Sequence, residues 1–198
     1  MNPKPKCIIV TGRPGSGKTT LAKELGRWLH MPVISRDEIK EGYVNTYGVG
    51  HDELPLDTNR VVSTLFFELV NHYLVGKVSL IIEAAFQHHV WASQLPRILE
   101  LGSAFIIVCS VDSMIAAERH LKRGLENASR EFYHGDEQVA VYRERGVRAA
   151  PEEYLVPEFD VPTIHVATEG EYTPSLADVV MRVQLLGMGD VSGEQMCG

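Results

Sequence analysis

The sequence contains no apolar run that approaches the roughly 20 residues needed to cross a membrane. The N-terminal residues, MNPKPKCIIVTG, also include no apolar stretch of the length found in signal peptides. Neither membrane insertion nor secretion is therefore expected, and we expect a cytoplasmic protein with no membrane partner.

Cysteine is scarce, and acidic residues outnumber basic ones. Cys7, Cys109 and Cys197 are far apart and form no CxxC pair, so we expect free thiols and no zinc site of recognisable spacing. The 19 basic and 26 acidic residues leave a formal net charge of −7. A general surface for binding polyanions is therefore not expected, and a nucleic-acid partner is unlikely on these grounds.

The 198 residues, 44% of them hydrophobic, suffice for one domain with a real core and are too few for two of full size. Apolar runs alternate with helical patterns, which is typical of an α/β domain with a mostly parallel sheet. Strands are predicted at 6–10, 32–35, 78–82, 104–109 and 163–166. Helices are predicted at 19–29, 37–47, 58–75, 89–101, 112–123, 138–148 and 175–186.

Right-handed crossovers between these strands predict a three-layer α/β/α fold with a five-stranded sheet and one ligand-binding edge. We expect a single domain over residues 1–186, and a disordered tail over 187–198, which has no periodicity. Thr173 and Pro174 are expected to cap and begin the last helix. Two apolar helix faces are predicted for the core: Leu21, Leu25, Trp28 and Leu29, and then Val61, Leu65, Leu69 and Tyr73.

A phosphate-binding loop is the most specific motif. Residues 12–19 match GxxxxGK[ST] at every fixed position, between a predicted strand and a predicted helix. The glycines let backbone N–H groups turn toward a phosphate, and the helix N-terminus adds the positive end of its dipole. Lys18 provides a charge for the β- and γ-phosphates, and the Thr19 hydroxyl can ligate Mg²⁺. We therefore expect ATP at Gly12, Arg13, Pro14, Gly15, Ser16, Gly17, Lys18, Thr19 and Thr20.

The remaining motifs narrow the class of phosphate-loop protein. No NKxD guanine motif is present, and the chain is small for a motor or transport ATPase. The sequence resembles the polynucleotide-kinase-like branch of P-loop kinases, small AAA-type ATP-binding proteins that include 5′-hydroxyl polynucleotide kinases and antibiotic phosphotransferases. The resemblance covers about residues 6–186 and rests on the loop, SRDEIK at 35–40, IIE at 81–83, Arg119 with Arg123, and TPSL at 173–176. It implies a phosphotransferase with an arginine-bearing lid at about 112–136.

Asp37 is the predicted catalytic base. It follows a strand at the ligand-binding edge, where phosphoryl transfer to a hydroxyl needs a group that orients the acceptor. The resemblance assigns this role to the aspartate of the Arg36–Asp37 pair, and a helix cap is the alternative. Lys40, on the same helical face, and Arg36 are candidates for acceptor binding, although Lys40 could also be a surface lysine.

Glu83 ends the predicted strand 78–82 next to the phosphate loop. A carboxylate there can orient Mg²⁺ through water, or it can hold the acceptor hydroxyl. The resembling family more often has aspartate at this position. Glu83 is therefore expected to act in catalysis and at the metal, and whether Asp37 or Glu83 is the base stays open.

Arg119 and Arg123 lie four residues apart on one predicted helix, so their side chains should face the same way. The resemblance implies that both bind ATP from the lid and that Arg123 also stabilises the transferring phosphoryl group. A solvated charged face is the alternative for both residues and for Arg130.

The adjacent histidines His88 and His89 would not face one metal ion, and no third ligand stands at a suitable spacing. His88 is a candidate for acceptor contact, and the roles of His89 and His134 stay open.

The sequence therefore predicts an ATP- and Mg²⁺-dependent kinase that phosphorylates a hydroxyl of a small molecule. A polynucleotide 5′-hydroxyl kinase is one alternative, which the acidic balance disfavours. A regulatory ATP-binding protein that hydrolyses slowly is another, which Asp37, Glu83 and the arginine pair disfavour. The acceptor and the oligomeric state stay undetermined.

Overall fold

The computed structural model describes residues 4–127, 129–135, 137–148, 150 and 153–186. Cys197 and the predicted tail at 187–198 lie outside this part of the chain. Among the described residues, no helix combines the length and the apolar character needed to cross a membrane.

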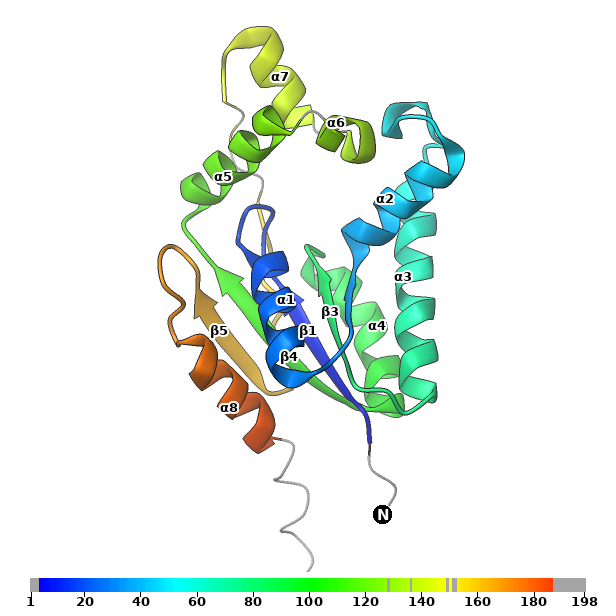
Figure 1. Cartoon of the computed structure of the whole chain (residues 1–198), viewed down its shortest axis with the longest axis vertical. Helices are drawn as coiled ribbons and strands as arrows, with labels where there is room; N and C mark the ends of the chain where they lie inside the picture. The colour runs from blue at the N-terminus through cyan, green and yellow to red at the C-terminus, as the bar shows by residue number, and fades with distance from the viewer. Residues whose placement is uncertain (1–3, 128, 136, 149, 151–152, 187–198) are drawn as a thin grey trace, which may run out of the picture.

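A five-stranded parallel sheet forms the centre of the molecule (Figure 1). Its order is β2-β3-β1-β4-β5, with β1 at Lys6–Thr11, β2 at Val33–Ser35, β3 at Leu80–Ala84, β4 at Ser103–Ser110 and β5 at Thr163–Ala167. Every neighbouring pair is parallel, which confirms the predicted α/β fold. The central strands are buried on both faces, so they appear in the sequence as continuous apolar runs.

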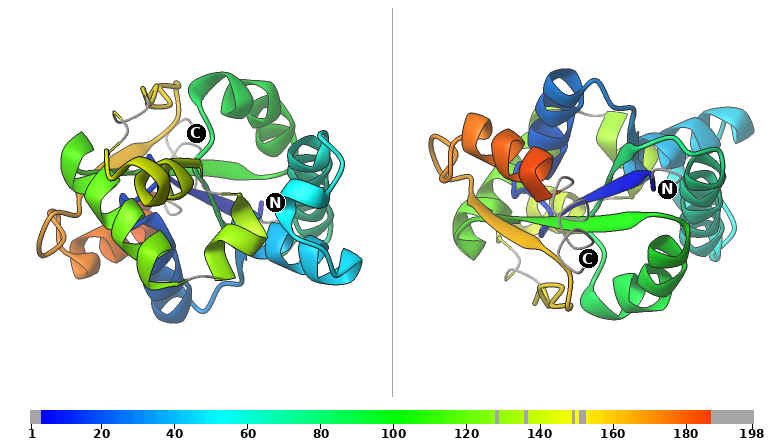
Figure 2. Two further views of the ribbon diagram at one scale, coloured as in Figure 1. Left: turned by 90° about the horizontal axis from the view of Figure 1, so that it is seen from above. Right: turned by 90° about the horizontal axis from the view of Figure 1, so that it is seen from below.

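Helices cover both faces of this sheet (Figure 2). On one face, α1 (Lys18–Leu29) and α8 (Leu176–Leu186) pack on Ile8 and Val10. On the other, α3 (Thr58–Val75) and α4 (His88–Leu101) pack on Ile9 and Ile82. Cys7 and Cys109 are free and buried, one in each layer, as expected for small apolar thiols.

The remaining helices stand above the carboxyl ends of the strands (Figure 1). They are α2 (Arg36–Tyr47), a short 3₁₀ helix η1 (His51–Glu53), α5 (Ser113–Glu126), α6 (Ser129–His134) and α7 (Glu137–Arg145). Asp112 caps α5, because its carboxylate accepts hydrogen bonds from the backbone N–H groups of Met114 and Ile115. The sequence predicted α5 and α7 but not α6, which is too short to show a helical period.

Both predicted core faces need correction. Trp28 is 59% exposed, so the buried stripe of α1 consists of Leu21, Ala22 and Leu25. In α3, Leu65 and Leu69 are exposed, and the buried side chains are instead Thr58, Val62, Phe66, Phe67, Val70 and Leu74. Apolar residues lie on more than one side of this helix, so the 3.6-residue period is compatible with two different buried faces. The aromatic cluster of Phe66, Phe67, Phe86 and Trp91 selects one of them.

The predicted cap of the last helix is also wrong. Thr173 bridges Ala167 through backbone hydrogen bonds and lies before the helix. Ser175 is the capping residue, because its hydroxyl accepts a hydrogen bond from the backbone N–H of Asp178. Pro174 therefore belongs to the turn that precedes α8 and not to its first turn.

Candidate active site

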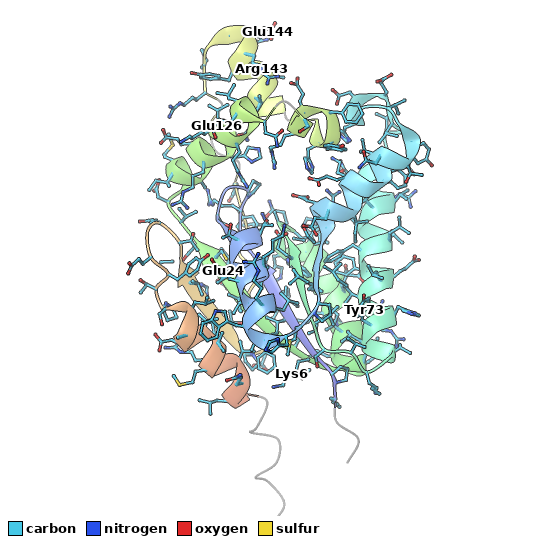
Figure 3. The ribbon with its side chains drawn as sticks, viewed as in Figure 1. Lys6, Glu24, Tyr73, Glu126, Arg143 and Glu144 are labelled. Atoms are coloured by element: carbon cyan, nitrogen blue, oxygen red, sulfur yellow. The ribbon has the colours of Figure 1, made fainter. Side chains whose placement is uncertain are left out.

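A cavity of about 810 Å³ opens at the carboxyl edge of the sheet. Figure 3 shows side chains that project from α2 on one side and from α5 and α6 on the other into the space above the strands. The cavity brings together most of the residues singled out in the sequence: Arg13, Pro14, Lys18, Thr19, Thr20, Arg36, Asp37, Lys40, Arg123, Arg130 and His134. Arg143 and Glu144 lie far from it, at the outer end of α7 (Figure 3).

The phosphate loop has the backbone shape that its glycines allow. Gly15 and Gly17 have φ angles of 82° and 80°, in the left-handed region that favours glycine. A Cβ atom at Gly15 would collide with the backbone carbonyl of Ala116, so α5 rests directly on the loop. Thr168 Oγ1 donates to the carbonyl of Ser16 at 2.7 Å and ties the segment after β5 to the same loop.

The loop fits the triphosphate of a nucleotide. Gly17 is the N-cap of α1 and has no side chain to satisfy the N–H groups of the first turn. Ser16 Oγ is buried and has no hydrogen-bond partner among the described residues, and a buried hydroxyl without a partner is uncommon in native proteins. An anion with several acceptor oxygens would satisfy both sets of donors.

Lys18 and Glu83 form a buried ion pair beneath the cavity floor. Lys18 Nζ lies 3.5 Å from Glu83 Oε1, and the two side chains are 9% and 2% exposed. Ser35 Oγ donates to Glu83 Oε2 at 2.7 Å. The register explains this contact, because Glu83 is opposite Ser35 of β2 on one side and Val10 of β1 on the other. Glu83 therefore holds the phosphate-loop lysine and is itself absent from the cavity lining.

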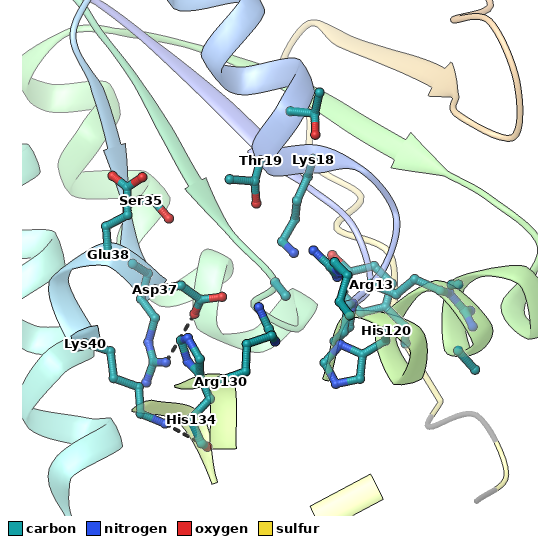
Figure 4. Close-up of a pocket in the computed structure, with 18 of the residues that line it drawn as sticks. Arg13, Lys18, Thr19, Ser35, Asp37, Glu38, Lys40, His120, Arg130 and His134 are labelled. Atoms are coloured by element: carbon teal, nitrogen blue, oxygen red, sulfur yellow. Dashed lines mark hydrogen bonds and ion pairs between the residues drawn. The ribbon is translucent and has the colours of Figure 1, made fainter. Parts of the chain in front are cut away.

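Asp37 stands in the cavity between two groups of cations. Figure 4 shows its carboxylate directed into the space that Lys18 and Arg130 also face. Burial alone would raise the pKa of Asp37, but positive charge on Lys18, His134, Arg36 and Arg130 outweighs burial and holds the pKa below its ordinary value. Asp37 is thus a carboxylate at neutral pH, able to accept a proton but not to donate one.

Arg36 and Lys40 extend from the same helix as Asp37, and Figure 4 shows Lys40 on the side of Asp37 away from Lys18. Arg36 Nη1 lies 3.6 Å from Asp37 Oδ1, and Nη2 donates to Asn59 Oδ1 at 2.8 Å. Lys40 is only 3% exposed, which excludes the surface-lysine alternative. Its Nζ donates to the carbonyl of His134 at 3.2 Å. Burial, reinforced by the positive charge of Arg36, lowers the pKa of Lys40 to about 8.

The helix α6 completes this wall, a role that the sequence did not reveal. His134 Nε2 lies 3.0 Å from Glu41 Oε1, and Tyr133 OH donates to Asn45 Oδ1 at 3.0 Å. Both contacts join α6 to α2, more than 80 residues earlier in the chain. In the sequence, His134 stands shortly after the predicted lid helix. This position does not indicate which residue His134 contacts.

The two lid arginines diverge in the structure. Arg123 lines the cavity. Arg119 instead donates to the backbone carbonyls of Thr168 and Glu169, at 2.9 and 2.8 Å, and is absent from the lining. Arg119 therefore braces the segment after β5 against α5, next to the phosphate loop.

His88 does not reach the cavity. Its ring stacks on Phe159 with centroids 4.6 Å apart, and Nδ1 accepts a hydrogen bond from the backbone N–H of Glu158. The expected contact of His88 with an acceptor is therefore not supported by its position. Gln87, its neighbour, lines the cavity instead and binds Glu153 and Leu155 through both ends of its amide.

A polar network that the sequence did not suggest lies below the cavity. Thr11 Oγ1 donates to the carbonyl of Ala84 at 3.0 Å and accepts from Trp91 Nε1 at 3.1 Å. Its oxygen also lies 3.0 Å from the hydroxyl of Tyr154, a cavity-lining residue. Burial raises the pKa of Tyr154, so this phenol stays protonated. The network fixes the end of β1 from which the phosphate loop starts.

The Thr19 hydroxyl lines the cavity at the start of α1. Among the described residues, no cluster of three or more His, Cys, Asp or Glu side chains could hold a metal ion by itself. The chain would therefore supply one hydroxyl ligand to Mg²⁺, that of Thr19, and phosphate oxygens and water would complete the coordination of the ion.

The comparison with protein families decides the family. The model of the AAA domain matches residues 7–145. This chain belongs to the AAA domain family. The matched region runs from β1 to α7 of this AAA domain and so includes the phosphate loop, Asp37, Glu83 and Arg123.

Individual relatives of this AAA domain are distant. A segment of 42 residues is 40% identical to cytidylate kinase of Pyrobaculum calidifontis, and it spans 21% of the chain and 23% of that relative. A candidate kinase from Chloroflexus aurantiacus has a crystal structure with a TM-score of 0.72 at 21% identity, over 92% of this chain and 98% of the other. The APS kinase of Mycobacterium tuberculosis, in complex with AMPPNP and APS, has a TM-score of 0.60 at 15% identity, over 93% and 98%. The fold is therefore that of P-loop kinases.

Proposed function

We propose that the protein is an ATP- and Mg²⁺-dependent kinase that transfers the γ-phosphoryl group to a hydroxyl of a small molecule. The observation that carries the proposal is the position of Asp37, an ionised carboxylate in the same cavity as Lys18 and Thr19 of the phosphate loop. Such a site needs three parts: a phosphate cradle, a cation at the transferred group, and an acceptor-orienting base.

Each part would be filled by residues of this chain. The loop N–H groups and Lys18 would hold the phosphates, and Arg13 and Arg123 would face them from the cavity wall. Thr19 would bind Mg²⁺, which supplies neutralisation of charge on the phosphates when bound. A single catalytic domain would then cover residues 1–186, with α5 and α6 in the lid at about 112–136.

Asp37 is our candidate for the base, in preference to Glu83. Asp37 would accept the proton of the acceptor hydroxyl while the new O–P bond forms and the bond to the ADP oxygen breaks. Its lowered pKa makes it a weaker base than an ordinary aspartate, and it would also orient the hydroxyl. Glu83 already binds Lys18 and Ser35, and it would act indirectly by fixing the lysine.

A phosphate group as acceptor is the second candidate, because the 42-residue segment is shared with a cytidylate kinase. Transfer to a phosphate oxygen requires little proton removal at neutral pH, so Asp37 would then matter much less. A polynucleotide 5′-hydroxyl remains a third possibility, which the net charge of −7 disfavours.

The test is a screen for ADP release that depends on an added acceptor, with Mg²⁺ present. The panel contains hydroxyl compounds, nucleoside monophosphates and a 5′-hydroxyl oligonucleotide. A hydroxyl compound should stimulate the wild type, and Asp37→Asn should lower this rate by about 10²–10⁴-fold. Glu100→Gln is the control, because Glu100 forms an exposed ion pair with Arg97 on α4 and does not line the cavity.

Stimulation only by nucleoside monophosphates or only by the oligonucleotide would replace the proposal with the corresponding alternative. ADP release that no acceptor raises above a slow basal rate would favour a regulatory ATP-binding protein.

A further inference from the structure

Buried and half-buried basic side chains of α2 and α6 line the cavity around Asp37. We define the cationic pocket as Arg36 and Lys40 of α2 and Arg130 of α6, with His134 of α6 beside them. We infer that the cationic pocket binds an anionic group of the acceptor, a carboxylate or a phosphate, so that the phosphorylated alcohol is itself an acid. This inference rests on the proposed kinase function and names its substrate class.

Lys40 is the strongest evidence. Lys40 is only 3% exposed. Its Nζ contacts the backbone carbonyl of His134 rather than a carboxylate. Within the described part of the chain, Lys40 forms no ion pair. Burying an ammonium group without a counter-charge is costly, and such groups normally bind an anion or lose their proton.

The two arginines of the cationic pocket also have unused donors. The Nε atoms of Arg36 and Arg130 are buried and have no hydrogen-bond partner among the described residues. Buried guanidinium N–H groups are rarely left unsatisfied in native proteins. Because guanidinium groups bind carboxylate and phosphate oxygens especially well, an anion is the ligand that these donors fit.

The carboxylates that the structure describes near the cationic pocket form no ion pair with Lys40. Asp37 Oδ1 lies 3.6 Å from Arg36 Nη1, but Asp37 forms no ion pair with Lys40, and its carboxylate is directed into the space that Lys18 and Arg130 also face (Figure 4). Glu41 pairs with His134 and is 44% exposed. Asp52 is exposed and is absent from the cavity lining. Among the described residues, no carboxylate forms an ion pair with Lys40, and we infer that a ligand supplies this counter-charge.

The triphosphate is not the expected occupant either. Lys18, which would hold the triphosphate, lies on the opposite side of Asp37 from Lys40 (Figure 4). Lys40 follows Asp37 by three positions on α2, so their Cβ atoms are about 5–6 Å apart. A compound with its hydroxyl at Asp37 would thus place a group a few atoms away next to Lys40.

The geometry also favours a small acid over a polymer. The contacts of Tyr133 with Asn45 and of His134 with Glu41 attach α6 to α2 directly beside the cationic pocket. A polynucleotide would have to leave the cavity past this bridge, whereas a compact acid would fit beneath it.

The inference is tested by isothermal titration calorimetry on the full chain saturated with AMPPNP and Mg²⁺, which keeps the phosphate loop filled. Malonate and inorganic phosphate are titrated separately at pH 7, and malonamide is the uncharged match to malonate. We expect one or both anions to bind, and malonamide not to. Lys40→Met keeps the side-chain length without the charge, and it should weaken anion binding by about tenfold or more. Lys122→Met, an exposed change on α5, should not.

The outcomes distinguish failure of the anion site from failure of the proposed kinase function. Binding of malonate alone or of phosphate alone supports the inference and identifies the anion as carboxylate or phosphate. If AMPPNP binds and neither anion does, or if Lys40→Met binds anions as the wild type does, the inference is overturned and the kinase proposal stands. If AMPPNP itself does not bind, the proposed function fails and the inference fails with it. Arg130→Gln is the second variant if Lys40→Met does not fold.

Discussion

Lys18 of the phosphate loop and Glu83 at the end of β3 form a buried ion pair, with Nζ and Oε1 3.5 Å apart. Lys23 and Glu38 approach more closely, to 2.8 Å, but both side chains are about half exposed. Water screens the second pair, so burial rather than distance makes the first pair important.

Loss of Lys18 should therefore have two separable consequences. Lys18→Met removes the phosphate contact and leaves the Glu83 carboxylate buried without its cation, which should cost about 3 kcal/mol of unfolding free energy. Adding Glu83→Gln should restore much of that stability but no ATP turnover. Urea unfolding and ADP release measure the two effects, and Lys23→Met should change stability by at most about 1 kcal/mol. Wild-type turnover in Lys18→Met would refute the phosphate-loop assignment.

Asp37 and Glu83 should respond differently to magnesium. Asp37→Asn keeps the shape of the side chain but does not take up a proton, so MgATP binding should persist while transfer falls about 10²–10⁴-fold. Glu83→Gln should also shift the Mg²⁺ concentration that gives half-maximal rate, because it disturbs Lys18 beside the bound phosphates. The measurement is acceptor-dependent ADP release across a magnesium titration. Full transfer in Asp37→Asn, together with loss in Glu83→Gln and no magnesium effect, would make Glu83 the base.

Arg123 and Arg119 should have different roles in the kinetics. Arg123 lines the cavity, so Arg123→Ala should lower kcat by about 10²–10³-fold with little change in ATP Kd. Arg119 binds the carbonyls of Thr168 and Glu169, so Arg119→Ala should loosen that segment and weaken ATP binding more than it lowers kcat. Separate measurement of kcat and Kd distinguishes them. Unchanged kcat in Arg123→Ala would move this residue out of the catalytic machinery.

Lys40 should make the stability of the protein depend on pH. Its pKa falls from 10.5 in the unfolded chain to about 8 in the fold, so the unfolded chain binds more protons between these values and stability rises with pH across that window. Below pH 8 the burial of the charged lysine lowers the free energy of unfolding by about 3 kcal/mol, because one pKa unit corresponds to about 1.36 kcal/mol. The charged and titratable groups that interact with it are Arg36, Asp37, His51, Asp52 and His134.

Lys40→Met should therefore be more stable than the wild type at pH 7, and this difference should shrink between pH 8 and about 10.5. Urea unfolding of both proteins across this range isolates Lys40, because other groups titrate equally in the two. A difference that stays constant with pH would mean that Lys40 keeps an ordinary pKa.

Local chemistry made much of the fold predictable. The five parallel strands follow from five apolar runs separated by helices, and the cap at Asp112 follows from residue type and spacing. Periodicity failed where a helix is apolar on more than one side, as in α3, because the stripe that faces inward depends on what packs against it. It also missed α6, which has only six residues.

The sequence by itself determined the phosphate loop, because the geometry of that loop depends on glycines and a lysine within eight consecutive residues. Tertiary structure alone decided which side chains meet across the chain. Glu83 bonds Ser35 from 48 residues away, and Lys40 bonds the carbonyl of His134 from 94 residues away. Helical spacing predicted that Arg119 and Arg123 share a face. In the structure Arg119 binds the segment after β5, whereas Arg123 lines the cavity. Such contacts depend on how elements pack, and the residues involved carry no local signal of their partners.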